Sequence, residues 1–322
     1  MDGHRLLRIS LKRAGNEKSQ SNTGITFAEL FRQIDPLMIR LIECPRDAMQ
    51  GIKEFIPTEK KILYLNQLLR VGFHTIDFGS FVSEKAIPQM RDTEEVLQSL
   101  DLEHTQSELL SIVANVRGAE KACSFDQIDC IGYPFSVSET FQQRNTNSSI
   151  AVSLVRVAEI QRLCLDSAKT LVVYISMGFG NPYGDLYSPD IVVDWCRRLF
   201  NDYGVRIIAP SDTIGASNAA SIDALFRQLI PALPGVEFGA HLHTTPEAWN
   251  EKVDAAWQAG CRRFDGAIKG FGGCPMAEDS LTGNMPTERV LDYCRDHEIT
   301  TGIDLAEFHI ASMMAADIFP VA

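Results

Sequence analysis

The chain has 322 residues, of which 45% are hydrophobic and 22% charged, an ordinary globular composition with enough apolar material for one large domain or two smaller ones. A formal net charge of -12 argues against a nucleic-acid-binding protein, although local arginines and a bound metal still allow an anionic substrate. No stretch approaches the roughly 20 apolar residues of a membrane span, so we expect a soluble protein without a membrane partner.

Short runs rich in β-branched residues alternate with longer amphipathic runs through the first half of the chain. We predict strands over residues 37–43, 75–79, 108–115 and 129–135. We predict helices over residues 58–72, 92–100, 118–124 and 148–168. Thr58, with the charged residues after it, suits a helix start, and Gly72 suits the end of that helix.

The same alternation continues through the second half. We predict strands over residues 170–176, 205–210, 236–243 and 263–268. We predict helices over residues 189–203, 216–233 and 246–259, and a helical tail with breaks from residue 287. Residues 170–176 are almost continuously apolar, as expected for a strand buried on both faces.

Eight strand–helix repeats are typical of an α/β protein of the (β/α)8 TIM-barrel type, here with a helical C-terminal extension. A doubly wound open sheet is the alternative, but no G-x-G-x-x-G follows the first strand. Because no Pro/Ser-rich linker divides the chain, we expect one catalytic domain over residues 25–322. The polar, basic residues 1–24 predict a flexible or poorly ordered N-terminal segment. A transit peptide is the alternative, against which the acidic Asp2 and Glu17 weigh.

The eight cysteines are scattered, mostly inside apolar runs, and form no C-x-x-C pair. That usage suits a reducing compartment, where a free cysteine behaves as a small buried hydrophobe. We therefore expect a cytoplasmic location, or the mitochondrial matrix if the source is eukaryotic.

His241 and His243 flank a leucine at the end of the strand predicted over residues 236–243. Residues at i and i+2 of a strand point to the same face, so both rings should converge on one point. Because neutral imidazole is a common metal ligand, this His-x-His pattern predicts half of a divalent-metal site. Two unrelated polar residues at a strand terminus are the alternative. We expect the His243 ring to face solvent-accessible space.

The other predicted strands also end in polar residues, and in a TIM barrel chemistry gathers where strands end. Asp47 follows the first strand and Asn284 follows the eighth. With the two histidines they form a mixed oxygen and nitrogen set that suits Mg²⁺ or Mn²⁺, whereas turn or capping roles are the alternative for each residue alone. We expect further strand-end residues to line the substrate site: Gln50, Asp77, Ser80, Ser83, Ser176, Asp212 and Thr213.

A glycine-rich stretch after the eighth strand carries a single thiol, Cys274. Glycines let a loop bend over a site, and a thiol beside a cation can act as an acid, a base or a nucleophile. An incidental cysteine in a surface loop is the alternative.

The strand-end motifs resemble the DRE-TIM metallolyase superfamily and, within it, most closely the 3-hydroxy-3-methylglutaryl-CoA (HMG-CoA) lyases. The resemblance runs from about Leu37 to Cys294. The motifs that carry it recur in order: Pro45-Arg46-Asp47 with Gln50, Ser80-Phe-Val-Ser83 with Pro88-Gln-Met90, Asp212-Thr-Ile-Gly215, His241-Leu-His243, and Gly272-Gly-Cys-Pro275 with Gly283-Asn284.

The resemblance implies a divalent metal, Mg²⁺ or Mn²⁺, held by Asp47, His241, His243 and Asn284. It implies that Arg46 steadies an enolate oxygen and that Cys274, on a mobile loop, takes part in proton transfer. The same resemblance implies that Gln50, Asp77 and Asp212 surround the substrate. The implied roles agree with elementary chemistry, because a metal acidifies the 3-hydroxyl and a guanidinium stabilises the departing enolate.

Some residues depart from the lyase pattern. Ala48 replaces the usual glycine, Asp77 a longer glutamate, and Thr244 an aspartate. The segment between Cys274 and Asn284 is also about one residue longer.

The resemblance predicts a metal-dependent lyase that cleaves an HMG-CoA-like acyl-CoA thioester to acetyl-CoA and acetoacetate. A Claisen-type acyl-CoA condensing enzyme of the same superfamily, and a drifted barrel that binds a ligand without turnover, are the alternatives. We also expect a homodimer.

Overall fold

Eight parallel strands close into a barrel in the computed structural model, which describes residues 38–273 and 282–319. The strands follow one another in chain order, and β1 pairs with β9 to close the ring. Their bounds are β1 (Arg40–Glu43), β2 (Thr75–Ser80), β3 (Glu108–Ile112), β4 (Cys130–Ser136), β5 (Thr170–Ser176), β6 (Ile207–Pro210), β7 (Glu237–His241) and β9 (Arg263–Gly266). The predicted (β/α)8 barrel is confirmed.

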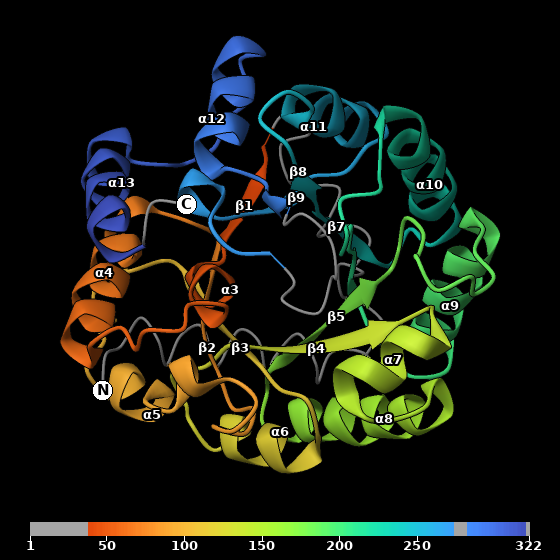
Figure 1. Ribbon diagram of the computed structural model, residues 1–322, viewed down its shortest axis with the longest axis horizontal. Coiled ribbons are helices and arrows are strands. Elements are labelled where there is room, and N and C mark those ends of the chain that lie inside the picture. Colours follow the sequence, from red (N-terminus) through yellow and green to blue (C-terminus); the bar gives the residue numbers. More distant parts are fainter. Residues whose placement is uncertain (1–37, 274–281, 320–322) are drawn as a thin grey trace, which may run out of the picture.

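Helices surround the barrel and cover its outer face (Figure 1). Most follow the strands in alternation, while α13 lies against α4 as the predicted C-terminal helical extension. Their bounds are α3 (Pro45–Gln50), α4 (Thr58–Val71), α5 (Thr93–Gln98), α6 (Val116–Cys123), α7 (Glu139–Thr146), α8 (Ile150–Asp166), α9 (Pro189–Asn201), α10 (Ala219–Ala232), α11 (Trp249–Gln258), α12 (Thr287–Asp296) and α13 (Leu305–Ile318), with 3-10 turns η2 (Pro88–Met90) and η3 (Ile268–Gly270).

Local sequence accounts for several helix ends. The side chains of Ser149, Ser188 and Asn218 cap the first turns of α8, α9 and α10 by accepting hydrogen bonds from backbone N–H groups. Gly72 ends α4 with a φ of 93°, a left-handed conformation that a glycine adopts at little cost.

The structure differs from the predicted elements at three places. The helix α3 directly follows β1, and α7 precedes α8; neither was predicted. The strand predicted over residues 236–243 is divided, because β7 ends at His241 and a separate strand, β8 (His243–Thr244), pairs with β10 (Gly283–Asn284). α3 has six residues and α7 has eight, so both are too short to show the apolar periodicity that identifies a helix.

The core lies mainly between the barrel and its helices. Strand β5 illustrates why: after Thr170 every residue is buried, as its continuous apolar run predicts. A smaller apolar cluster, including Leu110, Val172 and Tyr174, fills the barrel itself. None of the helices within the described ranges is long and apolar enough to span a membrane. The N-terminal segment 1–24 and Cys274 lie outside the described residues.

Candidate active site

The carboxyl end of β1 leads directly into α3, which carries two of the predicted site residues. Arg46 and Asp47 lie in the first turn of this short helix, and Pro45 occupies a starting position that suits its fixed φ. Both charged side chains are buried, with 8% and 7% of their surfaces exposed. The helix α3 itself lies over one end of the barrel (Figure 1), and it carries this guanidinium and carboxylate.

Three predicted metal ligands meet at this end of the barrel. Potential ligand atoms of Asp47, His241 and His243 all lie within 4.8 Å of one another. The centroids of the two imidazole rings are 5.5 Å apart, so the rings do converge although the strand divides between them. The expectation that His243 faces solvent-accessible space is wrong, since the residue is only 3% exposed.

Hydrogen bonding indicates which ring nitrogens are free for a ligand. His241 Nδ1 lies 3.1 Å from Asp265 Oδ2, an arrangement that orients the ring and leaves Nε2 available. His243 Nε2 is buried and has no hydrogen-bond partner among the described residues. Buried polar atoms are normally paired, so this orphaned nitrogen, together with a nearby carboxylate and a second imidazole, fits a divalent metal ion.

The electrostatic environment favours the metal-binding protonation states of Asp47 and His243. Burial, followed by the neighbouring His241, lowers the pKa of His243 to about 4, so its imidazole is neutral at pH 7. Burial acts to raise the pKa of Asp47, but Arg46 and the two histidines outweigh it and bring the pKa below its ordinary value. For His241, burial is outweighed by Asp265, and the pKa rises.

A second group of potential ligands, Cys44, His241 and Asp265, lies alongside. Burial, then several nearby carboxylates, raises the pKa of the Cys44 thiol well above its ordinary value. A thiol binds metal as the thiolate, and Asp265 is already hydrogen-bonded to His241. The Asp47 group is therefore the better metal site.

Asn284, the fourth predicted ligand, joins the group through the small sheet beside the barrel. Strand β10 places Asn284 opposite His243 in β8. Its Nδ2 donates to Asp47 Oδ2 at 2.7 Å and to the Phe271 carbonyl at 2.9 Å. Gly272 allows this approach, because a Cβ there would lie 2.7 Å from Asn284 Nδ2 and the residue has a φ of +90°.

Arg46 connects the metal group to the end of β2. Its Nη1 donates to Asp47 Oδ1 at 3.0 Å and to Gln50 Oε1 at 2.8 Å. Its Nε and Nη2 both donate to Asp77. Burial raises the pKa of Asp77 to about 6, although Arg46 opposes the shift. The guanidinium is thus held in a fixed orientation beside the metal group.

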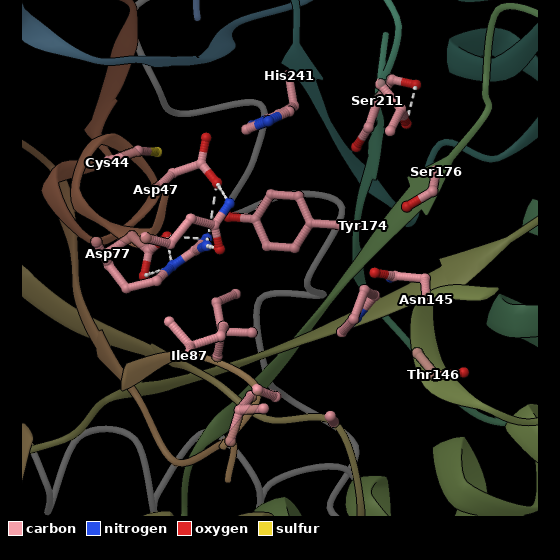
Figure 2. A pocket seen from close by; sticks show the side chains of 18 of the residues that line it. Cys44, Asp47, Asp77, Ile87, Asn145, Thr146, Tyr174, Ser176, Ser211 and His241 are labelled. Carbon is pink, nitrogen blue, oxygen red and sulfur yellow. Dashed lines mark hydrogen bonds and ion pairs between the residues drawn. The ribbon is translucent and has the colours of Figure 1, made fainter. Parts of the chain in front are cut away.

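A cavity of about 290 Å³ opens next to this network (Figure 2). Predicted site residues that line it are Arg46, Asp47, Gln50, Asp77, Ser176, Thr213, His241 and His243. Its remaining wall is largely apolar and includes Val82, Ala86, Ile87, Ile112 and Phe141. A ligand that fills the cavity would therefore meet both polar groups and hydrocarbon.

The polar lining residues that were not predicted include Tyr174, Asn145 and Thr146. Figure 2 shows the Tyr174 ring extending from β5 into the pocket toward Asp47. The ring lies 5.6 Å from that of His241, and the hydroxyl is buried without a hydrogen-bond partner among the described residues. Tyr174 shares a strand face with Ser176, a spacing that identifies it in the sequence. No comparable signal marks Asn145 and Thr146, which come from the unpredicted helix α7.

Three of the predicted substrate-site residues do not line the cavity. Ser80 is buried and donates to the Ile112 carbonyl, while Ser83 is exposed. Asp212 is 1% exposed, and its carboxylate accepts hydrogen bonds from Ser217 and Lys252. Substrate contacts of these three residues stay predictions.

Comparison with known proteins identifies the family. Residues 40–314 match the HMGL-like family model. The chain is 32% identical over 261 residues to the hydroxymethylglutaryl-CoA lyase YngG of Bacillus subtilis, covering 81% of this chain and 86% of that protein. It is 31% identical to the 3-hydroxy-3-isohexenylglutaryl-CoA/hydroxymethylglutaryl-CoA lyase of Pseudomonas aeruginosa, covering 84% of this chain and 89% of that protein.

Solved structures agree with the sequence relatives. An HMG-CoA lyase from Acinetobacter baumannii, solved in complex with coenzyme A and 3-methylmalate, superposes with a TM-score of 0.81 and 29% identity. The match covers 88% of this chain and 92% of that one. The family model spans the barrel and every element that carries the site, and the chain accordingly belongs to the HMGL-like family.

Proposed function

We propose that the protein is a divalent-metal-dependent HMG-CoA lyase, which splits its acyl-CoA thioester substrate into acetyl-CoA and acetoacetate. The observation that carries the proposal is the meeting of Asp47, His241 and His243 beside the Arg46 guanidinium at the cavity. Relatives named as lyases of this substrate support it over most of the chain.

Asp47, His241, His243 and the amide of Asn284 would hold the metal in this proposal. Oxygen and neutral imidazole donors without a thiolate suit Mg²⁺ or Mn²⁺. When bound, such an ion supplies Lewis-acid chemistry, orienting the substrate and lowering the pKa of its 3-hydroxyl.

Arg46 is the residue proposed to stabilise the reaction's charge. Cleavage of the bond between C2 and C3 turns the 3-hydroxyl carbon into a ketone and leaves the bonding electrons on the thioester fragment as an enolate. A buried guanidinium fixed by Asp77 and Gln50 offers its remaining N–H, on Nη2, to that enolate without reorganising.

Two protons must move in the cleavage. The 3-hydroxyl loses one as the ketone forms, and C2 of the enolate gains one to become the methyl group of acetyl-CoA. We propose that Cys274 takes part in the second transfer, and that Gln50, Asp77, Ser176 and Thr213 orient the substrate. The Tyr174 hydroxyl adds a further buried donor on the cavity wall.

The proposal extends to the setting of the enzyme. The seven described cysteines form no disulfide with one another, which supports a reducing compartment such as the cytoplasm or, in a eukaryote, the mitochondrial matrix. Exposed apolar side chains on α13, such as Leu305 and Met313, support the proposed homodimer. Sedimentation velocity measures that assembly.

The test is an assay of acyl-CoA thioesters with Mg²⁺ or Mn²⁺, with chelator-treated protein as the control. We expect HMG-CoA to yield acetyl-CoA and acetoacetate only when metal is present. Condensation of acetyl-CoA with an oxo-acid, without HMG-CoA cleavage, would instead indicate the Claisen-type activity. Thioester binding with no turnover of any kind would contradict an enzymatic role.

A further inference from the structure

The backbone of the segment His241-Leu242-His243 is held at each of its carbonyl groups. The Asp212 amide donates to the His241 carbonyl at 2.9 Å, and the Met285 amide donates to the Leu242 carbonyl at 3.0 Å. The His243 carbonyl accepts from the Lys252 ammonium group at 2.8 Å. Two of these contacts are backbone contacts, whereas the contact at His243 depends on a side chain.

Lys252 is a buried lysine on α11 that lines neither the cavity nor the metal group. It is 3% exposed, and its ammonium group also lies 3.0 Å from Asp212 Oδ2. Asp212 is itself 1% exposed and accepts two further hydrogen bonds from Ser217. Burying a lysine and a carboxylate costs desolvation free energy, so stability alone does not explain why an ion pair lies in this position.

Asp212 and Lys252 together touch both histidine carbonyls. The Asp212 backbone N–H binds the His241 carbonyl. The Asp212 carboxylate orients the Lys252 ammonium group, which in turn binds the His243 carbonyl. His243 lies in β8, outside the barrel ladder, so the strands of the barrel do not position it. A two-residue strand needs additional contacts if it is to hold a side chain within a fraction of an ångström of its metal-binding position.

We propose that Lys252, oriented by Asp212, is a positioning residue that sets His243 for the divalent metal. This inference rests on the proposed metal site. It also gives Asp212 a role in holding the two histidines in place, which accounts for its absence from the cavity wall. Partners of this kind around a metal ligand typically change metal affinity by about 10- to 100-fold when removed.

The protein offers a matched control, the pair Lys61 and Asp92. Lys61 is 2% exposed, its ammonium group lies 2.7 Å from Asp92 Oδ1, and it also donates to the Gln89 carbonyl. It thus makes the same two kinds of contact as Lys252, from α4 to η2 and to the N-cap residue of α5, and none of these residues belongs to the metal group. Loss of either pair should cost a similar amount of stability.

The experiment compares Lys252→Met and the double variant Asp212→Asn/Lys252→Met with Lys61→Met and Asp92→Asn/Lys61→Met. The double variants leave no buried charge unpaired, so they keep the test valid if a single variant fails to fold. Mn²⁺ affinity is measured by calorimetry, with the melting temperature as a measure of folding. Nitrogen NMR of ¹⁵N-histidine-labelled, metal-free protein then reports the His243 ring directly.

We expect the Lys252 variants to bind Mn²⁺ about 10- to 100-fold more weakly and to shift the His243 ring resonances. The Lys61 variants should have a lower melting temperature, with unchanged Mn²⁺ affinity and unchanged His243 ring resonances. Mn²⁺ affinity within twofold of wild type in a folded Lys252 variant would overturn the inference, and so would an equal loss in the Lys61 variants. Wild-type protein that binds no Mn²⁺ would instead count against the proposed metal site itself.

Discussion

Arg46 and Asp77 form a buried ion pair that joins α3 to the end of β2, with Nη2 and Nε of the arginine 2.6 and 3.0 Å from Asp77 Oδ2. Because both nitrogens meet one carboxylate, the plane of the guanidinium is fixed. Its remaining nitrogen is directed at Asp47 and Gln50. Asp77, although shorter than the glutamate of the lyase pattern, therefore still fixes the orientation of the Arg46 guanidinium.

Asp77→Asn should both destabilise the barrel and slow turnover. Removing one partner leaves the Arg46 charge buried, which typically costs about 3 kcal/mol or more of unfolding free energy. We also expect kcat to fall by on the order of 100-fold, because the guanidinium loses its orientation toward the developing charge. Denaturant unfolding and steady-state kinetics measure the two effects. Asp92→Asn is the control, because it removes a buried carboxylate away from the site. An equal loss of kcat in this variant would show that the effect of Asp77→Asn is general destabilisation.

Tyr174→Phe should reduce turnover without reducing stability. The hydroxyl is buried and unpaired among the described residues, so its removal takes away no hydrogen bond. Burial, followed by nearby Asp265, raises the pKa of Tyr174 well above its ordinary value, which keeps the hydroxyl protonated as a donor to substrate. We expect kcat to drop by about 10- to 100-fold and the melting temperature to hold or rise. If the variant has the same kcat as wild type, Tyr174 lines the cavity and takes no part in turnover.

Metal should stabilise the folded protein through His243. At a metal concentration 100 times the dissociation constant, binding adds about 2.7 kcal/mol of unfolding free energy. We expect His243→Ala to abolish this gain, because the ring supplies a buried, unpaired nitrogen to the group. His74→Ala, a half-buried histidine outside the group, should keep it. Thermal melts with and without Mn²⁺ decide the matter, and an undiminished metal effect in His243→Ala would show that the site is misassigned.

Glu43 should make stability fall as pH rises. Burial raises its pKa to about 8, against hydrogen bonds from Thr287 and Ile268 that lower it. A raised folded pKa means that the stabilisation is complete below the ordinary value of 4.5 and is lost as pH approaches 8. The unfolding free energy should fall by up to about 1.4 kcal/mol per pH unit in that window. Denaturant unfolding of metal-free protein at pH 5 to 8 measures the slope, and Glu43→Gln should flatten it.

Limited alkylation should distinguish two cysteines. Among the described cysteines, Cys123 alone is not buried, and a hydrogen bond from Cys164 lowers its pKa to about 7. We expect Cys123 to be labelled at a rate that metal and a substrate analogue do not change. Labelling of Cys274 should be slowed by them, and Cys274→Ser should lower turnover by on the order of 10²–10⁴. Peptide mapping follows both sites. Equal protection of both cysteines, with near-normal turnover of the serine variant, would make Cys274 incidental.

The sequence alone determined the barrel and predicted where most of the candidate site residues gather. The alternating apolar runs predict the strand order, because each βαβ unit connects two neighbouring parallel strands by a right-handed crossover. The carboxyl ends of these strands all lie at the same end of the barrel. Asp47, His241, His243 and Asn284 could therefore be expected together, because each lies at or just beyond a strand end, and they do meet.

Only the tertiary structure decided how those residues are held. The strand break after His241, the pairing of β8 with β10 and the burial of Lys252 beside Asp212 depend on contacts between residues far apart in the chain. Lys252 carries no local signal, because a lysine on an amphipathic helix is usually solvated and only packing reveals a buried one. Local pattern thus predicts where polar groups gather, whereas side-chain packing sets which of them face the ligand and which support the others.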